Sequence, residues 1–397
     1  MAARRLAIVV ALVAACGDGA AGDDGAVPDA GPAADAALDA APTYVYPFAL
    51  PPGFPEPRLA APLTVELAEL GRHLFYDVRL SGNQTQACAS CHQQARAFAT
   101  DRVVELGSTG EAGRRNAPSL ANSLYNPTQT WANPVLESLE DQALVPLFGE
   151  FPLELGASGD EDEILARLAA EPVYPPLFAD AFPDDDAPFT MVNVVRALAA
   201  FERRLVSGNS LVDRAARGEA ELPADVARGK VTFQSEELQC HHCHGGFNFT
   251  HAVDYASLVE PATQFLNTGL YNVGGAGAYP ATDQGLFEFT TQPADRGRYK
   301  PPTLRNVGVT APYMHDGSVA TLEEVVAIYE RGGRLVTDGP NAGDGADNPY
   351  KSFFVSGFSL TPEERTDLVA FLRALTDDTF LTDPTLADPW PPAAAVR

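Results

Sequence analysis

Two short stretches of this chain decide its fold: Cys88-Ala89-Ser90-Cys91-His92 and Cys240-His241-His242-Cys243-His244. Both have the pattern C-x-x-C-H, in which two thiols can add to the two vinyl groups of one haem while the following His reaches the iron. A zinc ribbon also uses two C-x-x-C pairs, but here the pairs lie in opposite halves of the chain and each carries the trailing His. The sequence therefore predicts two covalently attached haem c groups, with His92 and His244 as the proximal iron ligands.

The second motif contains two further histidines at its variable positions. His241 and His242 are not placed to reach the iron that His244 binds, and we expect neither to have a functional role.

Composition limits the possible functions of the chain. Hydrophobic residues make up 45% of its 397 residues and charged residues 20%, which excludes a mostly disordered protein. Its 27 Lys and Arg against 53 Asp and Glu give a formal net charge of −26, which would repel phosphate backbones and excludes nucleic-acid binding. Five cysteines are too few for a disulfide scaffold.

The N-terminus has the pattern of an export signal. Two arginines precede an apolar run at 6–15, and Cys16 follows small residues, as in bacterial lipoproteins whose Cys becomes lipidated. The run spans about 15 Å as a helix, too short to cross a bilayer. We expect a signal peptide at 1–15 and an Ala/Gly/Asp/Pro-rich tether at 16–43, which place the folded part in the periplasm or cell envelope with only a lipid anchor at the membrane. An ordinary signal peptide with an incidental Cys remains the alternative.

Helical periodicity dominates the rest of the chain. Apolar residues recur at i, i+3 and i+4 in six segments, and strand alternation is weak: 63–76, 160–170, 189–206, 223–233, 321–331 and 361–375. Capping-box patterns begin the last two segments, at Thr321 and Thr361. A helix precedes each haem motif, so we expect a mainly α fold of two cytochrome-c-like haem domains, 44–212 and 213–397, packed together with long loops.

The second iron ligands are less evident. After signal removal only Met191 and Met314 remain as axial Met candidates, and Met191 fits the core face of its helix. In the segment 321–331, Tyr329 falls on the same face as Leu322 and points inward. From the helix pattern alone, Tyr329 is either a phenolate ligand or a core Tyr whose hydroxyl finds a hydrogen bond.

Further motifs lie between and after the haem motifs: Trp131, Leu-Glu-Asp-Gln at 139–142, Pro-Leu-Glu-Leu-Gly at 152–156, Leu-Arg-Asn-Val at 304–307 and Pro-Tyr-Met-His-Asp-Gly at 312–317. With them the chain resembles the bacterial di-haem cytochrome c peroxidase/MauG superfamily from about Leu59 onward. Two more stretches make it most similar to the MbnH enzymes, which are associated with methanobactin-type copper systems: Leu-Val-Pro-Leu-Phe-Gly at 144–149 and Asn-Ala-Gly-Asp-Gly at 341–345.

The resemblance implies a separate task for each haem: the peroxidatic haem at His92 and the electron-transfer haem at His244. Ordinary members carry an axial Met fourteen residues after the His of a Pro-Tyr-x-His motif, whereas fourteen residues after His315 stands Tyr329, as in MauG-type enzymes. Ordinary members also hold a displaceable His over the first iron, but 107–114 contains none. The resemblance therefore implies Tyr329 as the axial ligand and a first haem that is open without prior reduction.

The resemblance also implies roles for three residues near the first haem. A carboxylate in a dry pocket can move a proton between the two peroxide oxygens, and Glu154 matches that position, with Gln142 as a hydrogen-bonding partner. The interval of twelve residues between them is longer than in better-known members, which leaves Glu150 as a substitute; a solvated surface Glu is the other alternative. Trp131 matches the Trp that carries charge between the haems.

A calcium site and a partner protein complete the expectation. Asn116, Thr310 and Pro312 match a structural Ca²⁺ site between the domains, and oxygen ligands suit such a hard cation. The resemblance implies an oxidase that uses hydrogen peroxide to form a bis-Fe(IV) state and then oxidises a partner protein. In the MbnH-like case the target is a Trp, converted to kynurenine, on an MbnP-like copper-binding protein.

Two other functions remain open. The first is a di-haem cytochrome c peroxidase that reduces hydrogen peroxide with electrons from a small redox protein; the missing Met and displaceable His argue against it. The second is a non-enzymatic di-haem electron carrier, which would have six-coordinate irons that do not react with peroxide.

Overall fold

The computed structural model describes residues 44–261 and 264–390, and the predicted signal peptide (1–15) and tether with Cys16 (16–43) lie outside them. The described chain is mainly helical, as predicted. Its helices are α1 (Val65–Phe75), α2 (Cys88–Cys91), α3 (Leu139–Phe148), α4 (Glu161–Ala170), α5 (Tyr174–Ala181), α6 (Met191–Arg204), α7 (Leu211–Ala216), α8 (Ala224–Phe233), α9 (Phe287–Thr290), α10 (Leu322–Arg331), α11 (Pro362–Arg373) and α12 (Asp378–Leu381).

One small sheet accompanies these helices in the described residues. Strand β1 (Leu335–Val336) pairs antiparallel with β2 (Gly343–Asp344), and Leu335 lies opposite Asp344. No helix in the described ranges is both long and apolar enough to cross a membrane.

All six predicted helical segments are present, as α1, α4, α6, α8, α10 and α11. Both predicted capping boxes form: the Thr321 and Thr361 hydroxyls accept hydrogen bonds from the N–H groups of Glu324 and Glu364. The glutamate side chains accept in return from the N–H groups of the two threonines, which satisfies donors that a helix start leaves unpaired.

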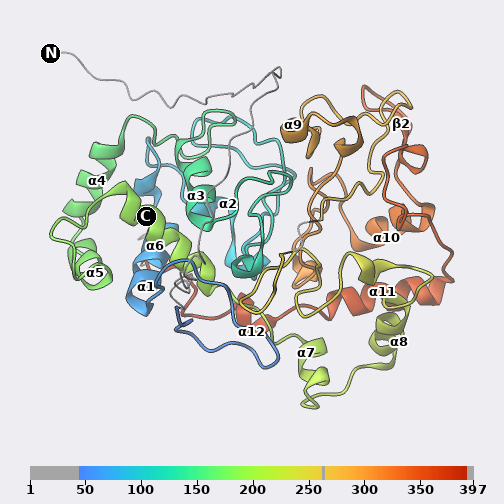
Figure 1. Ribbon diagram of the computed structural model, residues 1–397, viewed down its shortest axis with the longest axis horizontal. Coiled ribbons are helices and arrows are strands. Elements are labelled where there is room, and N and C mark those ends of the chain that lie inside the picture. Colours follow the sequence, from blue (N-terminus) through green and yellow to red (C-terminus); the bar gives the residue numbers. More distant parts are fainter. Residues whose placement is uncertain (1–43, 262–263, 391–397) are drawn as a thin grey trace, which may run out of the picture. The chain divides into compact units, whose positions relative to one another are not determined.

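Helices α1 and α6 form a packed pair beside the first haem motif (Figure 1). The Thr64 hydroxyl caps α1 by accepting from the Leu67 N–H at 3.1 Å. Gly71 lies where the helices cross, and a Cβ there would overlap the carbonyl of Ala197 on α6. Only glycine permits so close an approach. The crossing fixes the orientation of α1 against α6, and that orientation sets the direction in which the chain continues from α1 towards Cys88.

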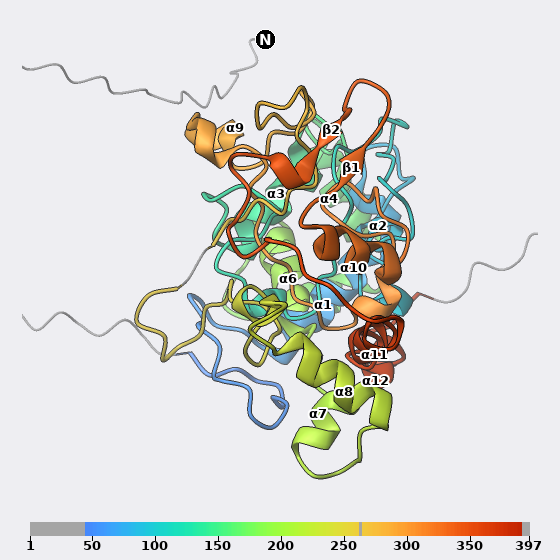
Figure 2. The same ribbon diagram turned by 90° about the vertical axis from the view of Figure 1, so that its right-hand side faces the viewer.

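The same arrangement recurs beside the second motif, where α8 packs on α11 (Figures 1 and 2). A Cβ at Gly229 of α8 would overlap the carbonyl of Asp367 on α11. Arg228 adds a two-pronged ion pair to the Asp367 carboxylate, at 2.6 and 2.9 Å. Each half of the chain thus holds its haem motif against one glycine-crossed helix pair.

Separate hydrophobic clusters surround these two pairs, one containing α1 and α6 and the other α8 and α11.

A buried polar network joins the segment just before α7 to the chain around α12. The Asp377 carboxylate accepts from the Ser207 hydroxyl and the Gly208 N–H, both at 3.1 Å, and Asn306 donates to Ser207 at 3.0 Å. The predicted boundary between the domains 44–212 and 213–397 lies a few residues beyond this network and stays a prediction.

Candidate functional site

The first motif forms helix α2 and directs His92 into a cavity. His92 Nδ1 lies 2.8 Å from the Phe98 carbonyl, so Nδ1 carries the proton and Nε2 keeps its lone pair. Burial lowers the pKa of His92, because desolvation disfavours the imidazolium. A neutral imidazole with a free Nε2 is suited to bind haem iron.

The second motif presents His244 in the same way. Its Nδ1 lies 3.1 Å from the Pro302 carbonyl and 3.3 Å from the Phe249 carbonyl, and burial lowers the pKa of His244 to about 4. None of the four motif cysteines forms a disulfide, so all four sulfurs can bond to haem. Burial raises the pKa of Cys240 to about 12 and that of Cys243 to about 11, so these thiols are not activated nucleophiles of the catalytic kind.

Both motifs line one cavity of about 570 Å³. Apolar side chains line it beside each motif, as a flat hydrophobic macrocycle requires: Phe75, Leu139 and Leu155 in the first half, and Phe233, Val326 and Leu372 in the second. The four cysteine sulfurs, the two neutral imidazoles and this lining fit two haem c groups.

The surroundings of Lys300 also bear on whether the cavity fits haem. Its ammonium is buried in the cavity wall, donates to the Thr128 carbonyl and forms no ion pair within the described residues. The Thr128 hydroxyl and Gln129 Oε1 also lack partners there, and burial lowers the pKa of Lys300 to about 7. The buried ammonium and the Thr128 hydroxyl can both donate hydrogen bonds, and such a pair suits an anionic group such as a haem propionate.

Glu154 and Gln142 both line the cavity, on a loop and a helix that pack together. Gln142 belongs to α3, and the loop after α3 folds back onto it, with the Leu155 N–H donating to the Pro146 carbonyl at 2.9 Å. Glu154 is accessible from the cavity, but the surrounding protein desolvates its carboxyl and raises its pKa. Both Glu150 and Glu154 are exposed, but only Glu154 is among the cavity-lining residues.

Glu154 also lies close to the first motif: its charge contributes to the raised pKa of both Cys88 and Cys91. The structure therefore brings Glu154 to the first haem position, where an acid–base group would act.

Trp131 is held from both halves of the chain. Its indole N–H donates to the Asn116 carbonyl at 2.9 Å, and its carbonyl accepts from the Lys300 N–H at 2.8 Å. The ring lines the cavity and packs against a small aromatic cluster that contains Tyr279 and Tyr299. Trp131 thus has a fixed position in the wall of the cavity that both motifs line, and its charge-relay role stays a prediction.

Tyr329 lines the cavity from α10. Burial is the main cause of its raised pKa, and the nearby Cys243 and Cys240 contribute. No hydrogen bond of its hydroxyl is present among the described residues. The tyrosine predicted as an iron ligand thus lies at the second motif with its hydroxyl uncommitted.

The three predicted calcium ligands, Asn116, Thr310 and Pro312, all line the cavity. Asn116 donates its N–H to the His315 carbonyl at 2.8 Å, which places it against the turn that carries Thr310 and Pro312. Its side-chain amide donates to the Arg102 carbonyl at 2.8 Å. The calcium ion itself stays a prediction.

Two cavity-lining residues that were not predicted from the sequence are buried and ionisable and form no ion pair within the described residues. One is Lys300; the other is Glu202 on α6, whose Oε2 has no partner among the described residues. Burial raises the pKa of Glu202 to about 8, and its charge acts on the Cys88 thiol. Helical periodicity could have found Glu202, because it follows the buried Leu198 by four positions. No comparable pattern marks Lys300.

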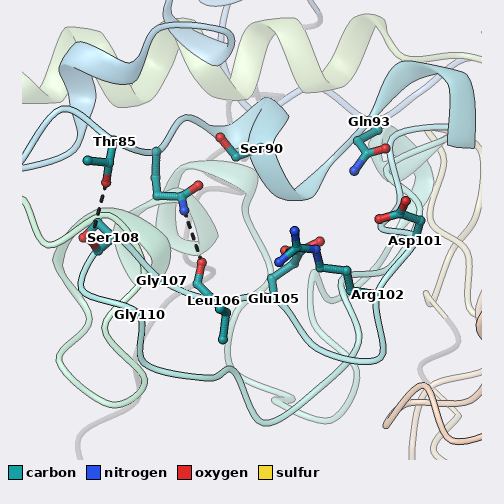
Figure 3. Close-up of a pocket in the computed structure, with 11 residues that line it drawn as sticks. Thr85, Ser90, Gln93, Asp101, Arg102, Glu105, Leu106, Gly107, Ser108 and Gly110 are labelled. Carbon is teal, nitrogen blue, oxygen red and sulfur yellow. Dashed lines mark hydrogen bonds and ion pairs between the residues drawn. The ribbon is translucent and has the colours of Figure 1, made fainter.

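A surface hollow of about 720 Å³ adjoins the first motif. In Figure 3, Thr85 and Ser90 line one side and the loop from Asp101 to Gly110 the other. Gln86, Glu105, Leu106 and Gly107 line both this hollow and the main cavity, so the surface approaches the first haem position here.

Comparisons with known proteins agree with this architecture. The profile of the di-haem cytochrome c peroxidase family matches residues 65–221, and a RoxA-like, cytochrome c-like profile matches 297–333. The methylamine utilization protein MauG of Methylorubrum extorquens is 33% identical, over 83% of each chain. The cytochrome-c peroxidase IdrP1 of Denitromonas iodatirespirans is 32% identical, over 98% of each chain.

Among solved structures, a MauG-like protein associated with microbial copper homeostasis has a TM-score of 0.86 and 46% identity. The match covers 87% of this chain and all of that one. Together, the two C-x-x-C-H motifs, their shared cavity and these relatives show that the chain belongs to the di-haem cytochrome c peroxidase/MauG family of haem oxidoreductases.

Proposed function

We propose that the protein uses hydrogen peroxide to oxidise a partner protein at a distance, in the manner of MauG. Two haems held by Cys88, Cys91 and His92 and by Cys240, Cys243 and His244 would supply the redox chemistry that reduces peroxide. One observation carries this proposal: Tyr329 of α10 lines the cavity beside Cys240 and Cys243 of the second motif. Met314 lines the same cavity, but it packs with the hydrophobic cluster that includes Trp131. A phenolate stabilises oxidised iron better than a thioether does, because the phenolate is anionic and hard.

Glu154 takes the acid–base role. Desolvation raises its pKa, which makes the Glu154 carboxylate a stronger base. The carboxylate can accept the proton of one peroxide oxygen and deliver that same proton to the other oxygen, which leaves as water. Gln142 orients the bound peroxide by hydrogen bonding from α3. Peroxide reaches this position from the hollow of Figure 3, whose lining continues into the cavity.

Trp131 takes the charge-relay role between the haems. Its indole N–H and its backbone carbonyl are both hydrogen-bonded, so the ring keeps one position during charge transfer. A fixed ring needs little rearrangement when an electron passes.

The substrate that we propose is a Trp on a copper-binding partner protein, with kynurenine as the product. Support comes from the solved MauG-like structure, which is described as associated with microbial copper homeostasis. Opening an indole to kynurenine removes more electrons than one peroxide accepts, so more than one peroxide is consumed for each Trp.

Two further properties belong to this proposal. A calcium ion bound by Asn116, Thr310 and Pro312 would brace Trp131, because the Asn116 carbonyl accepts the indole N–H. The protein would act in the periplasm or cell envelope, lipid-anchored through Cys16, a residue outside the described ranges.

An ordinary di-haem peroxidase is the second candidate. It is favoured by IdrP1, a cytochrome-c peroxidase that matches the chain over nearly its whole length. In that case a small redox protein would supply the electrons, and no amino acid of a partner would be changed.

Replacing Tyr329, the proposed ligand of the second haem iron, distinguishes an oxidase that acts on a partner protein from an ordinary di-haem peroxidase. We expect Tyr329→Met to raise the reduction potential of the second haem and to abolish the near-infrared band that charge sharing produces after peroxide addition. Tyr313→Phe is the matched control, because Tyr313 lines the same cavity but donates its hydroxyl to the Val307 carbonyl. A full band in Tyr329→Met protein would refute the role proposed for Tyr329.

A further inference from the structure

Three side chains gather beside the second haem motif: Glu236, His241 and His242. One candidate ligand atom from each lies within 4.8 Å of the other two. His242 Nε2 lies 3.1 Å from one carboxylate oxygen of Glu236, and His241 Nε2 lies 3.4 Å from the other. This cluster is not part of the haem cavity, because none of its members lines that cavity.

The positions of the two imidazoles are fixed by the covalent motif itself. His241 and His242 belong to the 3₁₀ turn η4 (Cys240–His242), and thioether bonds at Cys240 and Cys243 would anchor both ends of it. The His242 ring stacks on Phe354 with centroids 4.7 Å apart, and the two imidazole centroids are 4.2 Å apart. The two rings therefore need little rearrangement to act together.

The spacing of the three groups matches a metal site. Donors bound at about 2.0–2.2 Å to one ion lie roughly 3–4 Å from one another, and the two measured N–O separations are within that range. The side chain of Glu236 is 78% exposed, against 28% and 33% for His241 and His242. An ion held here would therefore keep coordination positions open towards solvent.

The donor types decide which metals suit the site. Two imidazoles and one carboxylate prefer borderline divalent ions, and for a given N/O site the affinity rises to Cu²⁺ and falls again at Zn²⁺. The net charge of −26 adds a field that attracts cations to the protein. A simple ion pair between Glu236 and a protonated His is the competing explanation, and it involves no metal.

We propose that Glu236, His241 and His242 form a surface site for one divalent transition-metal ion, with Cu²⁺ bound most tightly. The ion lies next to the peptide segment that carries the second haem, because Cys243 directly follows His242. The proposal does not depend on the function proposed above.

The test measures metal binding to the full-length holoprotein in its diferric form. After chelator treatment, Cu²⁺ is added and bound copper is counted by equilibrium dialysis, with EPR recorded on the copper signal. We expect one ion per chain at the highest-affinity site, with hyperfine coupling to two nitrogens. Zn²⁺ should compete for this ion but bind more weakly.

Variants assign the ion to the three residues. We expect Glu236→Gln and His242→Ala each to weaken Cu²⁺ binding on the order of tenfold or more. Glu237→Gln and His251→Ala are the controls, since both residues are exposed neighbours outside the cluster, and binding should not change. Haem content is measured in every variant, because His242 lies inside the C-x-x-C-H motif and its replacement could reduce haem attachment. Glu236→Gln leaves that motif intact, so it tests copper binding even if His242→Ala loses haem.

Equal copper affinity in wild type and Glu236→Gln would overturn the proposal, as would a copper signal without coupling to two nitrogens. Either result would leave the three residues as an ion-paired surface cluster.

Discussion

Glu154 is the residue on which peroxide cleavage depends in this account, because it combines a cavity position with a desolvated carboxyl. We predict that Glu154→Gln slows the reaction of the diferric protein with hydrogen peroxide by about 10²–10⁴-fold, the usual contribution of a positioned acid–base group. Stopped-flow absorbance measures the rate. Glu150→Gln is the control, since Glu150 does not line the cavity. Equal slowing in both variants, or in neither, would contradict the assignment.

Glu202 makes stability depend on pH. Burial raises its pKa from 4.5 to about 8. Between these values the unfolded chain releases the proton and the folded chain keeps it, so the folded state binds more protons and the free energy of unfolding falls as pH rises. The contribution is on the order of 1 kcal/mol per pH unit. We expect the melting temperature to fall across this window in wild type and to fall less in Glu202→Gln.

The matched control for this measurement is Glu163→Gln. The Glu163 side chain is 69% exposed on α4, so its replacement should leave the pH dependence as in wild type. A Glu202→Gln protein with an unchanged pH slope would show that Glu202 is ionised in the folded state.

At the scale of elements, the crossing of α1 and α6 depends on Gly71. We predict that Gly71→Ala lowers the free energy of unfolding by about 1–3 kcal/mol, because the added Cβ overlaps the Ala197 carbonyl and forces the helices apart. Urea denaturation of the holoprotein measures this change. A glycine in an uncrowded helix would behave in the opposite way, since Ala there stabilises by about 1 kcal/mol. A more stable variant would therefore disprove the close crossing.

The sequence predicted six amphipathic helices and missed the other six of the described residues, of which α2, α9 and α12 have only four residues each. Helix α3 was missed because Pro146 lies inside it, and its apolar residues follow no clear stripe. Helix α5 opens with two prolines, which its first turn tolerates because those N–H groups need no partner. Helix α7 has only six residues, too few for a periodic signal, although Ser210 and Asp213 form a capping box.

At the scale of the whole molecule, the haem attachment residues could be predicted because their chemistry is local and lies within five consecutive positions. The roles of Glu154 and Trp131 came from resemblance alone, since residues so distant in sequence give no local pattern. For Tyr329, helical periodicity predicted the inward position, and the resemblance implied the ligand role. Lys300 could not be predicted, because its burial depends on long-range folding around Thr128 and Trp131. His241 and His242 were expected to have no role because neither reaches the iron that His244 binds, and no sequence pattern indicated that Glu236 lies beside them.

We expect calcium binding to affect charge transfer between the two haems, because the ion would hold Asn116, which accepts the hydrogen bond of the Trp131 indole. We predict that chelator treatment weakens the near-infrared band after peroxide addition, because losing the ion loosens Asn116 and with it the hydrogen bond to the indole. Ca²⁺ should restore the band, and Mg²⁺ should not, since it demands smaller, near-octahedral coordination. Absorption spectroscopy before and after each addition checks this. A band that is insensitive to calcium would exclude a coupling role for the ion.

The most direct measurement adds one equivalent of hydrogen peroxide to fully oxidised, calcium-loaded holoprotein and records EPR and near-infrared spectra. This account predicts that both ferric haem signals disappear together and that a near-infrared band grows in, without prior reduction. A diferric protein that is inert to peroxide and reacts only after one haem has been reduced would contradict it, and would identify an ordinary di-haem peroxidase.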